Sequence, residues 1–129
     1  MAIIKSHTDL SQSKKLAEIL PLESADNYYS WHDERYYVVN KDCPYPYSLK
    51  EKIPCWSLAA LLDALPDELE DNHFLTLSKE GAEYCCCYED INGNSFRHTF
   101  ADNPVDACVA MVEKLNELTR ALNKLNKKG

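Results

Sequence analysis

The sequence lacks a long apolar run, a signal-peptide core and an excess of basic residues. No stretch approaches the roughly 20 consecutive apolar residues that a membrane-spanning helix needs. Polar residues follow soon after Met1, so the amino terminus does not have the apolar core of a secretory signal. The net charge of -7 argues against a protein that coats nucleic acid. We therefore expect a cytoplasmic protein with no membrane association and no direct binding to nucleic acid.

Internal repeats, low-complexity tracts and Cys-x-x-Cys pairs are also absent from the sequence. Zinc sites usually display such a cysteine pair, and the cytoplasm keeps thiols reduced. We therefore expect the six cysteines to be reduced core residues, and we expect no cofactor. Because no linker interrupts the 129 residues, the whole chain 1–129 is predicted to form a single domain.

The clearest pattern present is an amphipathic helix near the carboxyl end. Apolar residues recur there at spacings of four, three, four and three: Met111, Leu115, Leu118, Leu122 and Leu125. Asn103 is a good N-cap, Pro104 suits the first helical position, and Asp106 complements the helix dipole. These features predict a helix from about Asn103 to Asn126.

A β-hairpin is predicted immediately before this helix. Asn92-Gly93 separates strands at 83–89 and 95–100, and Asn-Gly favours a two-residue type I′ turn because both central positions need positive φ. Alternate residues of a strand point to opposite faces, and the other face would contain Arg97. Phenylalanines and thiols are easier to bury than arginine. We therefore expect the helix to cover the face that carries Cys85, Cys87, Phe96, His98 and Phe100.

The elements upstream complete a prediction of the α+β class. Helices are expected at 9–20, where Ser6 and Thr8 supply capping groups, and at 56–65. Strands are expected at 35–39 and 73–78. The predicted fold is thus a three-stranded antiparallel meander packed by a long C-terminal helix and a shorter helix. Residues 54–129 form this α-β-β-β-α core, and residues 1–50 add an N-terminal helix and a tyrosine-rich insert.

Three segments of the chain resemble a family that we recognise. They are residues 12–20 together with 24–29 (QSKKLAEIL and SADNYY), residues 54–62 (PCWSLAALL) and residues 102–108 (DNPVDAC). Together they look like a family of small uncharacterised proteins encoded in gut-bacterial genomes, often among prophage or other mobile-element genes. The resemblance implies a bacterial setting, and it implies no activity and no catalytic residue.

The tyrosine-rich insert is the main candidate binding surface. Tyrosine and tryptophan supply rigid contact area with a polar group, and they are favoured at recognition surfaces. Rows of tyrosine can equally seal the edge of a small domain, so both interpretations stay open. The candidate residues are Tyr28, Tyr29, Trp31, Tyr36, Tyr37, Tyr45 and Tyr47.

Three functional hypotheses follow from the sequence. The first is a protein-interaction or accessory module of a bacterial mobile element, which binds a protein partner through the insert or an exposed edge strand. The second is an acidic mimic of nucleic acid, because nine carboxylates lie between residues 63 and 90 against Lys79 alone. The third is a metal protein or enzyme, for which Cys85, Cys87 and His98 would supply the first ligands or a thiolate–imidazole pair.

Self-association through the C-terminal helix is a separate prediction. A helix of about 24 residues is roughly 36 Å long, whereas strands of about six residues span roughly 20 Å. The part of the helix beyond the sheet carries Leu118, Leu122 and Leu125. Either the N-terminal helix or a second copy of the chain must cover these side chains, and the second choice predicts a homodimer.

Overall fold

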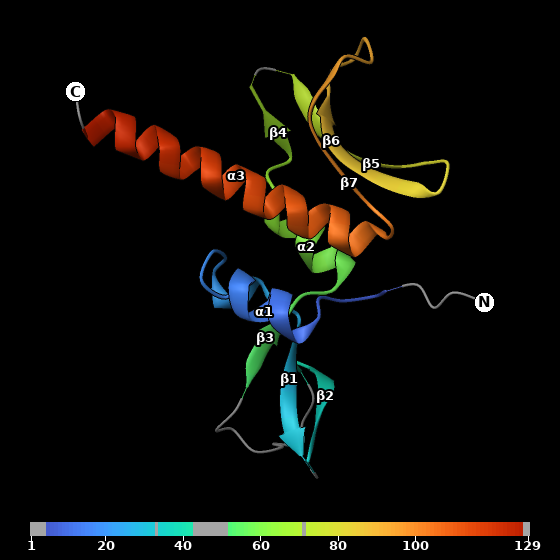
Figure 1. Ribbon diagram of the computed structural model, residues 1–129, viewed down its shortest axis with the longest axis vertical. Helices are drawn as coiled ribbons and strands as arrows, with labels where there is room; N and C mark the ends of the chain where they lie inside the picture. The colour runs from blue at the N-terminus through green and yellow to red at the C-terminus, as the bar shows by residue number, and fades with distance from the viewer. Residues whose placement is uncertain (1–4, 33, 43–51, 71, 128–129) are drawn as a thin grey trace. The chain divides into compact units, whose positions relative to one another are not determined.

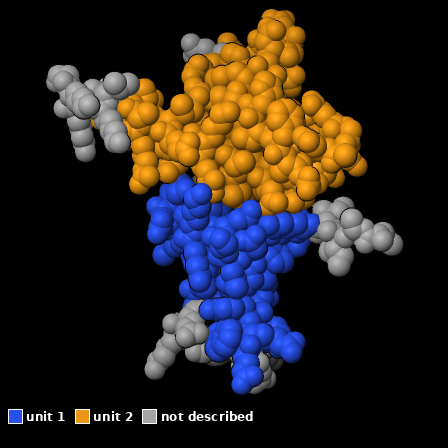
Figure 2. Space-filling view, viewed as in Figure 1, with its two compact units in different colours: residues 1–64 blue, residues 65–129 orange. Residues whose placement is uncertain are grey.

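The computed structural model describes residues 5–32, 34–42, 52–70 and 72–127 (Figure 1). The chain forms two compact units, Met1–Ala64 and Leu65–Gly129, which Figure 2 shows in different colours. The α+β class is confirmed, with an antiparallel meander in the second unit and a long C-terminal helix that packs on it. None of the helices described is long and apolar enough to cross a membrane.

The first unit contains a three-stranded antiparallel sheet in the order β2-β1-β3 (Figure 1). Its strands are β1 (Asn27–His32), β2 (Arg35–Asn40) and β3 (Ile53–Cys55). The helical segments are α1 (Leu10–Leu16), the single 3₁₀ turn η1 (Leu22–Ser24) and α2 (Leu58–Ala64). The predicted strand at 35–39 is thus present, whereas β1 and β3 were not foreseen. The boundary between units falls directly after α2, although the sequence grouped this helix with the later strands.

Helix α1 is shorter than predicted and has a different N-cap. Asp9, rather than Ser6 or Thr8, caps the helix by accepting a hydrogen bond from the Gln12 backbone N–H at 2.8 Å. The Gln12 side chain accepts a bond from the Asp9 backbone N–H in return, which completes a capping box. Thr8 instead lies fully buried, where its backbone N–H donates to the Trp56 carbonyl and its hydroxyl accepts from the Trp56 N–H.

The second unit contains a four-stranded antiparallel sheet in the order β4-β5-β6-β7, packed by one long helix (Figure 1). The elements are β4 (Glu68–Leu69), β5 (His73–Glu80), β6 (Glu83–Glu89), β7 (Ser95–Ala101) and α3 (Pro104–Lys127). Asn103 caps α3 as predicted, because its side-chain oxygen accepts from the Asp106 N–H at 2.8 Å. Helix α3 packs on β6 and β7.

The predicted orientation of the β6–β7 hairpin is wrong. Tyr88 and Cys86 are fully buried on the side of the sheet that faces α3, and the Thr99 hydroxyl donates to the Ala107 carbonyl of the helix at 2.7 Å. Phe100, which was expected beneath the helix, is 50% exposed on the opposite side. The helix therefore covers the face of the hairpin opposite to the one predicted.

The hairpin turn explains part of this difference. The loop contains three residues, since the Asp90 N–H donates to the Asn94 carbonyl, and Gly93 takes the left-handed position with φ of 85°. The Asp90 carboxylate accepts from the backbone N–H groups of both Asn92 and Asn94, which stabilises this longer loop. As a result, Tyr88 rather than Glu89 pairs with Phe96.

A β-bulge then restores the predicted register further along the strands. Between the pairs Tyr88–Phe96 and Cys86–Thr99, two residues of β7 lie opposite one residue of β6. Arg97, one of the two, has φ of 55° and forms an ion pair with Glu70 at 2.8 Å. The bulge places Phe96 on the helix side of the sheet while His98 and Phe100 stay on the other side.

Candidate functional site

The candidate site is the hairpin formed by β1 and β2, which contains most of the tyrosine-rich insert. Antiparallel pairing places Tyr29 opposite Val38, Ser30 opposite Tyr37 and Trp31 opposite Tyr36. The connection is short, because His32 pairs with Arg35, and Glu34 within it adopts a positive φ of 65°. Aromatic and β-branched residues favour such pleated strands, which is consistent with the composition of both segments.

Alternation along the strands divides the aromatic residues between two faces of the hairpin. Tyr29, Trp31 and Tyr36 share one face, where the Trp31 and Tyr36 ring centroids lie 4.8 Å apart in an edge-to-face arrangement. Tyr36 makes a second edge-to-face contact with Tyr29, at 6.3 Å. Tyr28 and Tyr37 lie on the other face. Each face therefore carries aromatic side chains.

Burial separates the aromatic residues into anchors and exposed groups. Tyr28 is buried, and the Tyr29 hydroxyl donates to the Thr8 carbonyl at 2.6 Å. Partial burial raises the pKa of Tyr29 to about 12, so this hydroxyl stays protonated and able to donate. Trp31 and Tyr37, by contrast, are 41% and 43% exposed. Tyr45 and Tyr47, the remaining predicted site residues, lie outside the residues that the structure describes.

Strand β2 lies at the edge of its sheet. Its inner side pairs with β1, and no strand within the described ranges pairs with its outer side. An edge strand offers unpaired backbone N–H and C=O groups, which can pair with a strand of another protein. Val38, on the same strand, adds an exposed apolar side chain. The hairpin thus combines exposed aromatic rings with an available backbone edge.

Among the described residues, no hydrogen bond joins His98 to Cys85 or Cys87. Cys85 and Cys87 are buried, and burial raises the pKa of the Cys87 thiol to about 12. His98 is exposed, and its Nε2 lies 2.6 Å from the Ser95 hydroxyl while its ring stacks on Phe100. Within the described part of the chain, no three Cys, His, Asp or Glu side chains are placed to hold a metal ion.

The carboxylates of the second unit lie towards the two ends of its sheet. Glu80 of β5 lies opposite Glu83 of β6 at one end of the two strands. Glu89 and Asp90 lie at the other end of β6, roughly 20 Å away for a strand of this length. The Asp90 carboxylate is engaged in the hairpin turn, where hydrogen bonds from Asn94 and Asn92 hold its pKa below the ordinary value. At this second end Glu68 and Glu89 both lie beside Phe74 in the sheet, so several carboxylates gather there.

Comparison of the chain with protein-family models, with curated proteins and with solved structures found no match. The resemblance to a family of mobile-element proteins therefore stays a prediction. Of the candidate site, the sequence foresaw the aromatic residues and β2 but missed β1. The run from Tyr28 to Trp31 is rich in strand-forming side chains, and this signal could have identified the second strand of the hairpin.

Proposed function

We propose that the protein is an interaction module that binds a protein partner through the β1–β2 hairpin. The observation that carries this proposal is the exposure of Trp31 and Tyr37 on a hairpin whose outer strand, β2, is an unpaired edge among the residues described. Tryptophan and tyrosine supply most of the binding free energy in many protein interfaces. Their exposure on a small domain therefore supports a recognition role.

The packing of the hairpin supports binding without large rearrangement. Trp31 rests against Tyr36, Tyr36 contacts Tyr29, and the Tyr29 hydroxyl is fixed to the Thr8 carbonyl. A partner that binds these rings does not have to order them first, which lowers the entropic cost of association. The outer backbone edge of β2 provides a second mode of contact, in which the partner adds a strand to the sheet beside β2.

The resemblance to mobile-element proteins supports a bacterial setting for this module. Within that setting the protein acts as an accessory factor, whose role is to bind and modify the behaviour of another protein. Such a role needs neither a metal ion nor a reactive thiol. The burial of Cys85 and Cys87 gives less support to an enzyme.

Affinity enrichment from the native host tests the proposal. The tagged wild-type chain should retain a specific partner, and the double variant Trp31→Ser/Tyr37→Ser should lose it. Phe74→Ser is a matched control, because Phe74 is 49% exposed but lies in the second unit. Circular dichroism melts establish that all variants are folded. A partner that is retained equally by the double variant would contradict the proposal.

A further inference from the structure

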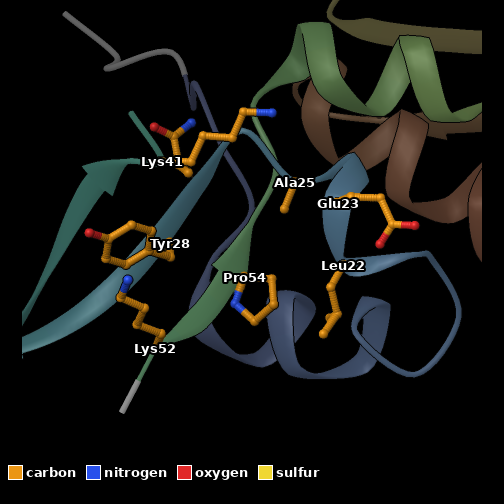
Figure 3. A pocket seen from close by; sticks show the side chains of 8 residues that line it. Leu22, Glu23, Ala25, Tyr28, Lys41, Lys52 and Pro54 are labelled. Atoms are coloured by element: carbon orange, nitrogen blue, oxygen red, sulfur yellow. The ribbon is translucent and has the colours of Figure 1, made fainter. Parts of the chain in front are cut away.

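The first unit contains a hollow of about 390 Å³ (Figure 3). Four stretches of the chain line it. They are η1 with the residue after it, the first two residues of β1, Lys41 directly after β2, and β3 with Lys52 directly before it. This volume lies near the lower end of the range for small-molecule sites, roughly 300 to 1,000 Å³. The lining residues are Leu22, Glu23, Ala25, Asn27, Tyr28, Lys41, Lys52 and Pro54.

The floor of the hollow is apolar. Tyr28 and Ala25 are both buried, and Pro54 lies directly opposite Tyr28 in the pairing of β1 with β3. Proline donates no backbone hydrogen bond, so this part of the floor presents carbon atoms rather than polar groups. Leu22 extends the apolar lining at the side formed by η1. A ligand with a compact apolar body would therefore bury that body against these side chains.

The charge at the hollow is opposite in sign to that of the whole chain. Lys41 and Lys52 both line it, although the net charge of the protein is -7. The Lys52 ammonium lies over the Tyr28 ring, 4.5 Å from its centroid, which holds the charge next to the apolar floor. Neither ammonium forms an ion pair with any residue of the described chain. Glu23, the carboxylate in the lining, lies across the hollow from Lys52 in Figure 3.

We propose that this hollow binds a small organic carboxylate with an aromatic or branched aliphatic body. The carboxylate lies beside the Lys52 ammonium, and the apolar body packs on Tyr28 and Pro54. Inorganic phosphate would fit less well, because the lining offers an apolar floor in place of several converging N–H donors. The proposal does not depend on the binding of a protein partner by the hairpin.

Titration of the full chain with 3-phenylpropionate tests this site. Isothermal calorimetry should show saturable binding in the millimolar range or tighter, and amide chemical shifts should change around Tyr28 and Lys52. The uncharged analogue 3-phenylpropanamide should bind about tenfold more weakly, because it cannot pair with an ammonium. Lys52→Gln should weaken binding of the carboxylate about threefold or more. Lys14→Gln, an exposed change on α1, should leave the affinity unchanged.

Three results would overturn the proposal. The first is an absence of saturable binding up to about 10 mM ligand, since weaker association would not distinguish a site from general surface contact. The second is equal affinity for the carboxylate and the amide, which would show that the positive charge at the hollow does not contribute to binding. The third is a set of amide chemical-shift changes at residues that do not line the hollow. The glutamine variants lie at exposed positions, so their folding is expected to be unaffected.

Discussion

Both carboxylate oxygens of Asp26 accept hydrogen bonds from Ser57: one from the backbone N–H at 2.9 Å and one from the side-chain hydroxyl. The Ser57 hydroxyl also accepts from the Ala60 N–H, so it caps the start of α2. Asp26 therefore connects the start of β1 to the start of α2. Asp26→Asn should lower the free energy of unfolding by about 1–2 kcal/mol in urea titrations at pH 7. Asp42→Asn, an exposed change after β2, should have almost no effect.

The contribution of Asp26 should also depend on pH. Burial alone would raise the pKa of this carboxyl, but hydrogen bonds from Ser57 outweigh burial and hold the pKa below its ordinary value. The stabilisation is therefore present above the unfolded pKa of about 4 and is lost as the pH falls through the lower folded pKa. The stability difference between wild type and Asp26→Asn should shrink between about pH 5 and pH 3. A difference that stays constant over this range would contradict the assignment.

Tyr88 should contribute to stability through both its ring and its hydroxyl. The side chain is fully buried, and its hydroxyl donates to the Pro66 carbonyl at 2.8 Å. Tyr88→Phe should cost about 1 kcal/mol, because the carbonyl loses its partner, and Tyr88→Ala about 3–5 kcal/mol. Tyr84→Phe on the same strand is the control, since Tyr84 is only half-buried. Equal losses for the two phenylalanine variants would show that the Pro66 contact contributes nothing.

The thiols of the described residues should be unreactive in the folded protein. Cys55, Cys85, Cys86, Cys87 and Cys108 are all buried, and burial raises the pKa of Cys55, Cys85 and Cys87. A Cys43→Ser variant removes the sixth cysteine. Treated at pH 8 with a chromogenic disulfide reagent, this variant should react only at the rate of unfolding. Rapid reaction of one thiol under native conditions would instead favour the enzyme hypothesis.

Self-association through α3 stays a prediction of the heptad-like spacing. Leu122 is 60% exposed, whereas Met111 and Val112, closer to the start of the helix, are buried. If a second copy covers Leu118 and Leu122, the mass from light scattering should rise from 14.8 kDa with concentration. Leu118→Ser/Leu122→Ser should abolish this rise, and Arg120→Ser on the exposed side should not. A single-chain mass for wild type at millimolar concentration would exclude the dimer.

Local signals in the sequence were sufficient for the C-terminal helix. Asn103 and Asp106 bond to each other across the first turn, and such an interaction can be predicted from spacing alone. The error at the β6–β7 hairpin had two sources. Asn-Gly suggested a two-residue turn, which placed Phe96 on the wrong face, and the choice of the covered face rested on the preference for burying phenylalanines and thiols over Arg97. Asp90 and Gly93 occupy the first and fourth positions of a type I turn, and this competing signal indicated the three-residue loop. Arg97 in the bulge forms an ion pair with Glu70, and a contact between residues so distant in sequence could not be predicted from the local pattern.

The candidate site depended more strongly on contacts between distant residues. Composition identified the aromatic insert, but the division into anchors and exposed rings follows from the pairing of β1 with both β2 and β3. The bond from Tyr29 to Thr8 spans 21 residues, and no periodic pattern predicts it. The hollow beside Tyr28 likewise needs Lys52 and Pro54, which reach it only through the pairing of β3 with β1.

Site-specific photo-crosslinking in the native host tests the proposed recognition role of the hairpin most directly. The photoreactive amino acid p-benzoylphenylalanine replaces Tyr37 in one strain and Phe74 in another, since the two side chains are similarly exposed but lie in different units. We expect a discrete crosslinked product with another protein from position 37 and none from position 74. A product from position 74 alone, or no product from position 37, would contradict it.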